Sequence, residues 1–118
     1  MNGFGWLMGL VVVLVIVVSA KLCLGASRGG GAMAREKIKQ GATVIDVRTP
    51  SEYASGHYNG ATNIPLQALP NRLADVGDKK KAVVVYCASG MRSAQAARIL
   101  TAAGFMDVTN AGGLRNLE

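Results

Sequence analysis

The chain has 118 residues, half of them hydrophobic, and a formal net charge of +6. A sequence of this length is enough for one small domain with an appended segment. The positive charge comes with no nucleic-acid-binding motif and no interleaving of basic with aromatic residues, so we expect no nucleic-acid partner.

The first apolar segment, residues 4–24, is predicted to be a transmembrane helix. No charged residue occurs before Lys21, and Leu10–Val18 is an unbroken aliphatic run. A helix that spans the hydrocarbon core needs about 20 apolar residues, and Lys21 can extend its amine toward the interface. The alternative is a cleaved signal peptide. Val18-Ser19-Ala20 resembles a cleavage site, but the positive residues that normally precede the apolar region are missing.

Residues 1–20 contain no Lys or Arg, whereas residues 21–39 contain five basic residues: Lys21, Arg28, Arg35, Lys37 and Lys39. The positive-inside rule therefore predicts a single-pass protein of the inner (cell) membrane, with its N-terminus outside and its C-terminal domain in the cytoplasm. We also expect the basic stretch to contact anionic membrane lipid.

A Gly-rich linker is predicted at residues 25–32, followed by one domain over residues 33–118. Within it, a helical turn is predicted to begin near Thr49. Thr49 can cap this turn, Pro50 suits its first position, and Glu52 completes a capping box with Thr49. Pro70 interrupts one of the longer helical patterns. The predicted strands cover residues 42–47, 82–86 and 105–109, with a short extended piece at 64–65, and the predicted helices cover residues 33–40, 66–76 and 93–103. This alternation predicts an α/β layered fold with a mostly parallel central sheet flanked by helices.

Cys87 directly follows the apolar strand AVVVY, residues 82–86. In open α/β sheets, ligands bind at the carboxyl ends of the strands. Gly90 allows a tight turn that directs backbone N–H groups inward, while Arg92 and the following helix N-terminus add positive charge. These features predict a thiolate nucleophile that needs no histidine base. The alternative is a cysteine that simply packs in the core.

Several stretches resemble the rhodanese family. CASGMR (residues 87–92) matches its six-residue active-site loop, and VIDVRTPSEYASGHYNGATNIP (44–65) is similar to its other main signature. AARILTAAGFMDV (96–108) and NAGGL (110–114) follow in the family's order. The resemblance covers residues 35–114 and implies a single rhodanese domain, here with an N-terminal membrane anchor.

The resemblance implies sulfurtransferase chemistry. Cys87 would take sulfane sulfur from a small anionic donor such as thiosulfate, and the resulting persulfide would pass it to a thiol, a cyanide-like acceptor or a protein. No organic cofactor is implied, and the single histidine without clustered ligands predicts no metal site. The residues expected to bind substrate are Ala88, Ser89, Gly90, Met91, Arg92 and Ser93.

Four further residues are interpreted mainly as structural support. Asp46 and Arg48 are expected to brace the active loop, and Glu52 to cap a helix. His57 belongs to a loop-shaping motif of the family, and a thiolate already formed needs no general base.

Two other functions remain open at this point. Phosphatases and arsenate reductases use a similar cysteine–arginine loop, but the related phosphatases have one more residue between cysteine and arginine than the C-x4-R spacing found here. A non-catalytic binding module is the second alternative, although inactive relatives of the family typically lose the cysteine.

Overall fold

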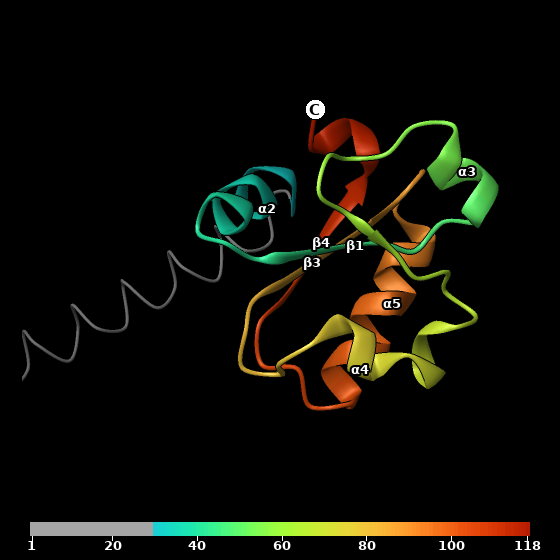
Figure 1. Ribbon diagram of the computed structural model, residues 1–118. Coiled ribbons are helices and arrows are strands. Elements are labelled where there is room, and N and C mark those ends of the chain that lie inside the picture. Colours follow the sequence, from blue (N-terminus) through green and yellow to red (C-terminus); the bar gives the residue numbers. More distant parts are fainter. Residues whose placement is uncertain (1–29) are drawn as a thin grey trace, which may run out of the picture.

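Four parallel strands form the sheet of the computed structural model, which describes residues 30–118 (Figure 1). They are β1 (Thr43–Asp46), β2 (Thr62–Asn63), β3 (Val83–Cys87) and β4 (Val108–Gly113), in the spatial order β2-β1-β3-β4. The helices are α2 (Gly30–Lys39), α3 (Pro50–Ala54), α4 (Leu73–Val76) and α5 (Met91–Ala102). Two 3₁₀ turns cover Leu69–Asn71 and Leu114–Asn116. The predicted α/β fold with a parallel central sheet is confirmed.

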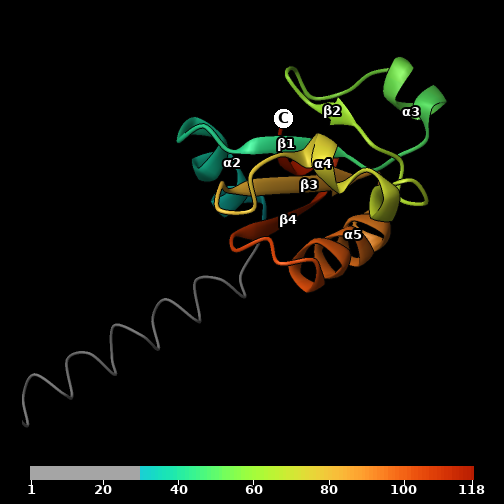
Figure 2. The ribbon, with the colours of Figure 1, turned by 60° about the horizontal axis from the view of Figure 1, so that its bottom comes forward.

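Side chains of β3 alternate between two apolar clusters, one on each face of the sheet. Val83, Val85 and Cys87 belong to the cluster that α5 and α4 cover, whereas Val84 and Tyr86 belong to the cluster beneath α2. All five β3 residues are buried, as expected for a central strand covered on both faces. Figures 1 and 2 show α2 on one side of the sheet and α5 on the other. Cys87 therefore faces α5.

The expected helix over residues 66–76 is wrong. The chain instead forms the 3₁₀ turn Leu69–Asn71 and the single turn α4, separated at Arg72. Pro70 lies inside the predicted helix, where it has no N–H to donate and its ring obstructs the preceding turn. The interruption is therefore a local effect of proline.

Other elements differ from the prediction at their boundaries. Helix α2 begins at Gly30, inside the predicted linker, and α5 begins at Met91, two residues earlier than expected. The short strand β2 lies at residues 62–63 and not at 64–65. The last strand was expected at residues 105–109, but Phe105 is buried in the α5 cluster and β4 extends to Gly113. A bulge between Asn110 and Gly112 accommodates this extension.

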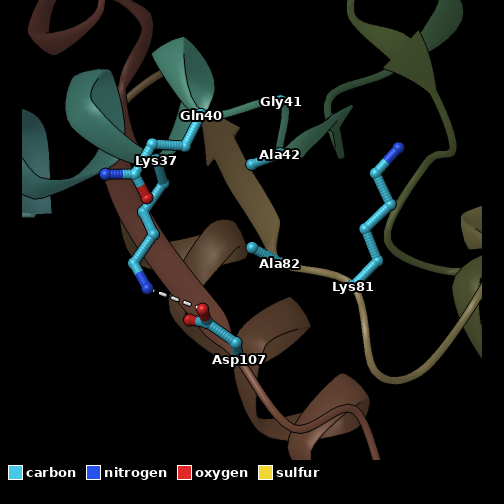
Figure 3. A pocket seen from close by; sticks show the side chains of 7 residues that line it. All are labelled: Lys37, Gln40, Gly41, Ala42, Lys81, Ala82 and Asp107. Atoms are coloured by element: carbon cyan, nitrogen blue, oxygen red, sulfur yellow. Dashed lines mark hydrogen bonds and ion pairs between the residues drawn. The ribbon is translucent and has the colours of Figure 1, made fainter.

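The end of the sheet opposite Cys87 carries a small cavity of about 150 Å³ (Figure 3). It is lined by the α2–β1 turn, by Lys81 and Ala82 before β3, and by Asp107 before β4. Lys37 Nζ lies 2.6 Å from an Asp107 carboxylate oxygen and ties α2 to the start of β4, whereas Lys81 extends away from that pair. These contacts fasten the helix layer to the sheet.

The predicted membrane anchor, residues 4–24, lies outside the described residues. Within residues 30–118, no helix has both the length and the apolar character needed to cross a membrane.

Candidate active site

Cys87 is the last residue of β3 and is fully buried. The loop that follows turns at Gly90, which has φ 106° in the left-handed region and precedes the first residue of α5. This backbone conformation is readily available only to glycine. It brings the Gly90 N–H to within 2.9 Å of Cys87 Sγ, to which it donates. The predicted turn at Gly90 thus places a donor on the sulfur.

The pKa of Cys87 lies below the ordinary value of a thiol. Burial raises it, but hydrogen bonds from the Ser93 hydroxyl and from the backbone N–H groups of Ser93, Gly90 and Ser89 lower it by more in total. Ser93 Oγ lies 3.5 Å from Cys87 Sγ and 3.0 Å from the Gly90 carbonyl oxygen. Its hydroxyl can turn to donate to the sulfur once the thiol has lost its proton. The loop therefore stabilises a thiolate with hydrogen bonds.

Ser93→Ala is expected to raise the pKa of Cys87, because the Ser93 hydroxyl is the largest of the interactions that lower it. At neutral pH a smaller fraction of Cys87 would be thiolate, so alkylation by iodoacetamide would slow. The measurement is the alkylation rate against pH, whose midpoint should move to higher pH while the plateau rate at high pH stays similar. An unshifted midpoint would contradict this role of Ser93.

Two glycines of β4 support the loop from behind. A Cβ atom added to Gly113 would lie 2.6 Å from the Ala88 carbonyl oxygen, closer than real Cβ atoms approach. A Cβ on Gly90 would lie 3.4 Å from Gly112 Cα, and Gly112 itself has φ 81°. The two glycines of the NAGGL motif are therefore explained by steric constraints, because they allow β4 to approach the cysteine loop closely.

Arg92 forms a two-pronged ion pair with Glu52. Its Nη1 and Nη2 atoms lie 2.7 and 3.0 Å from the two Glu52 carboxylate oxygens, and both side chains are about one-third exposed. Glu52 also completes the predicted capping box of α3, because it accepts from the Thr49 backbone N–H while its own N–H donates to Thr49 Oγ1. The capping role is confirmed. The sequence reading missed the ion pair, which connects α3 to α5.

Asp46 and Arg48 form a buried ion pair at the carboxyl end of β1, at the same end of the sheet as Cys87. Arg48 Nη2 lies 2.7 Å from Asp46 Oδ2 and also donates to the Gly56 carbonyl oxygen at 2.6 Å. The Tyr86 hydroxyl donates to Asp46 Oδ2 at 2.7 Å and accepts from the Tyr58 N–H. Burial raises the pKa of Tyr86 to about 12, so its hydroxyl remains protonated and can donate to Asp46.

This network agrees with the bracing role proposed for Asp46 and Arg48. Tyr86 and Asn63 were missed by the sequence reading. The Asn63 side-chain amide donates to the carbonyl oxygens of both Asp46 and Arg48, at 3.0 Å each. Asn63 lies near the end of the family signature over residues 44–65, which was a signal that could have found it, whereas Tyr86 has no feature that distinguishes it from an ordinary strand residue.

His57 is exposed and stacks on Tyr53, with ring centroids 3.6 Å apart. Its Nδ1 lies 2.9 Å from the Tyr53 carbonyl oxygen. These contacts fit the predicted loop-shaping role. Ala88, Ser89 and Met91 are exposed on the cysteine loop, and their expected contacts with substrate stay a prediction.

Comparison with known proteins shows which family the chain resembles. The family model of the rhodanese-like domain matches residues 32–116. Thiosulfate sulfurtransferase PspE of Escherichia coli is 47% identical over 74 residues, which are 62% of this chain and 71% of that protein. A sulfurtransferase of Allochromatium vinosum is 39% identical over 70 residues, 59% of this chain and 64% of the relative.

Solved structures give the same relationship. A structure described as rhodanese with anions from E. coli superposes with a TM-score of 0.62 and 45% identity, over 64% of this chain and 91% of that one. The human single-domain sulfurtransferase TSTD1 gives a TM-score of 0.65 at 28% identity, over 72% of this chain and 88% of that one. With a buried cysteine at the carboxyl end of β3 and the family model matching residues 32–116, the chain belongs to the rhodanese family.

Proposed function

We propose that this domain is a sulfurtransferase that moves sulfane sulfur from an anionic, thiosulfate-like donor to a thiophilic acceptor through a persulfide on Cys87. The observation that carries the proposal is the set of hydrogen bonds to Cys87 at the carboxyl end of β3. These hydrogen bonds lower the pKa of Cys87. A thiolate is the form of cysteine that attacks sulfur.

The reaction balances without an added oxidant or reductant. The Cys87 thiolate attacks the outer sulfur of thiosulfate, a new S–S bond forms, and the old one breaks as sulfite leaves with the electron pair. An acceptor nucleophile then attacks the terminal sulfur of the persulfide and regenerates the thiolate. Inward-facing N–H groups hold the anionic donor and then the persulfide anion.

The relatives support this reaction class. PspE and several matching GlpE proteins are named thiosulfate sulfurtransferases. The E. coli rhodanese structure is described as containing anions, and the proposed donor is also an anion. The spacing of four residues between Cys87 and Arg92, shorter than the phosphatase loop, also favours sulfur transfer over phosphoryl transfer.

The test is mass spectrometry of the purified protein after incubation with thiosulfate. We expect a mass gain of one sulfur atom, mapped to the peptide that contains Cys87 and removed by a thiol or by cyanide. An unmodified Cys87 after thiosulfate treatment, in protein that still reacts with iodoacetamide, would contradict the proposal.

We also propose that residues 4–24 anchor the domain to the cell membrane with the catalytic domain in the cytoplasm, on the basis of the apolar run and the basic residues that follow it. The expected result is that the full chain stays with membranes after carbonate extraction and that a C-terminal alkaline phosphatase fusion is inactive. An active fusion, or a soluble chain cleaved near Ala20, would support the signal-peptide alternative.

A further inference from the structure

The positive groups around Cys87 are partly balanced by one carboxylate. The Gly90 N–H, the N-terminus of the 12-residue helix α5 and the Arg92 guanidinium all favour an anion near the sulfur. Glu52 is bound face to face with Arg92 through both of its oxygens. Glu52 belongs to α3 and lies 40 positions before Arg92 in the chain, so the fold places its negative charge beside Arg92.

We propose that Glu52 is a specificity-determining residue that limits the affinity of the Cys87 site for anions by pairing with Arg92. The carboxylate offsets the charge of the guanidinium and occupies two of its N–H groups. An incoming anion therefore meets a weaker positive field than Arg92 alone would create.

Glu52 carries its negative charge at neutral pH. Hydrogen bonds from Arg92, and then from the Thr49 backbone N–H, lower the pKa of Glu52 to about 2. Arg48 lies at the same edge but is held by Asp46, so it supplies little free positive charge. Arg92 is thus the cation at this site whose positive charge Glu52 offsets.

The consequence for catalysis rests on the proposed sulfurtransferase function. A site that bound anions as strongly as possible would also hold sulfite after the first half-reaction and would exclude the second substrate. It would also bind other small dianions such as phosphate. Uniformly tight binding of substrate and product does not raise kcat. A balanced charge lets the donor bind and the product leave.

Glu52→Gln separates this role from the capping role. Glutamine at this position still accepts from the Thr49 N–H and keeps the capping box, but it carries no charge. Thr49→Ala is the matched control, because it removes the Thr49 hydroxyl, which caps α3 and donates to Glu52 Oε1, while leaving the Glu52–Arg92 pair in place. Glu52→Asp keeps the charge with a shorter side chain.

The first measurement compares alkylation of Cys87 by iodoacetate, an anion, and by neutral iodoacetamide of similar size. Glu52→Gln should raise the iodoacetate-to-iodoacetamide rate ratio by about twofold to fivefold, the range for interactions between partly exposed charges. Arg92→Gln should lower the ratio, whereas Thr49→Ala and Glu52→Asp should leave it near that of the unmodified protein. The ratio cancels changes in thiolate content, which affect both reagents equally.

The second measurement is steady-state kinetics. Glu52→Gln should lower KM for thiosulfate and strengthen inhibition by sulfite, without a rise in kcat. A ratio that is unchanged or lower in Glu52→Gln, or one raised equally in Thr49→Ala, would overturn the proposal and leave Glu52 as a structural brace. The alkylation assay needs no sulfur transfer, so its outcome is independent of whether the domain proves to be a sulfurtransferase.

Discussion

Cys87→Ser is expected to abolish sulfur transfer, lowering thiosulfate:cyanide activity by at least about a thousandfold, because a hydroxyl at neutral pH is a far weaker nucleophile than a thiolate. Serine also forms no persulfide. The fold should survive, since the change replaces one small buried side chain by another beside the hydroxyl of Ser93.

Circular dichroism and a thermal unfolding curve provide the control for Cys87→Ser. Arg98→Ala, a change at an exposed position of α5, is the matched activity control. Retained activity in folded Cys87→Ser protein would mean that sulfur does not pass through Cys87.

Asp46→Ala is expected to cost about 3–5 kcal/mol of unfolding free energy, the typical result of removing one partner of a buried ion pair. The substitution leaves the Arg48 guanidinium without its carboxylate and removes the acceptor of the Tyr86 hydroxyl. A domain of this size has a total stability on the order of 5–15 kcal/mol. The variant should therefore unfold at a much lower urea concentration, measured by fluorescence or circular dichroism.

Asp75→Ala is the matched control, because Asp75 forms an exposed ion pair with Arg72. It should change the unfolding free energy by less than about 1 kcal/mol, as exposed pairs usually do. If both substitutions have the same small effect, the Asp46–Arg48 pair does not brace the active-site edge as its burial indicates.

Local patterns in the sequence were enough to predict the parallel sheet, the capping box at Thr49 and the position of Cys87 at a strand end. Each depends on residues close together in the chain: the apolar run before Cys87, or the Thr49–Glu52 spacing. The prediction of a helix over residues 66–76 was wrong, because Pro70 divides its apolar pattern between a 3₁₀ turn and a single helical turn. The sequence did not predict that β4 extends to Gly113, because glycines seldom indicate a strand.

The site was harder to predict where it depends on contacts between distant segments. Arg92 was expected to bind the donor, and nothing in the local sequence shows that Glu52 reaches it from α3. The hydrogen bond from Tyr86 to Asp46 likewise joins residues 40 positions apart. Such pairs follow from the order of strands in the sheet, which local propensities do not determine.

The close contact between β4 and the cysteine loop has a consequence for protein synthesis. The ribosome makes Cys87 before residues 108–113, yet Gly113 pairs with Cys87 and packs against Ala88. While β4 is still inside the ribosome, β3 lacks one of its two neighbouring strands and the loop lacks its backing. The four-stranded sheet, and the packing of Gly113 against the cysteine loop, can therefore form only after β4 has left the ribosome.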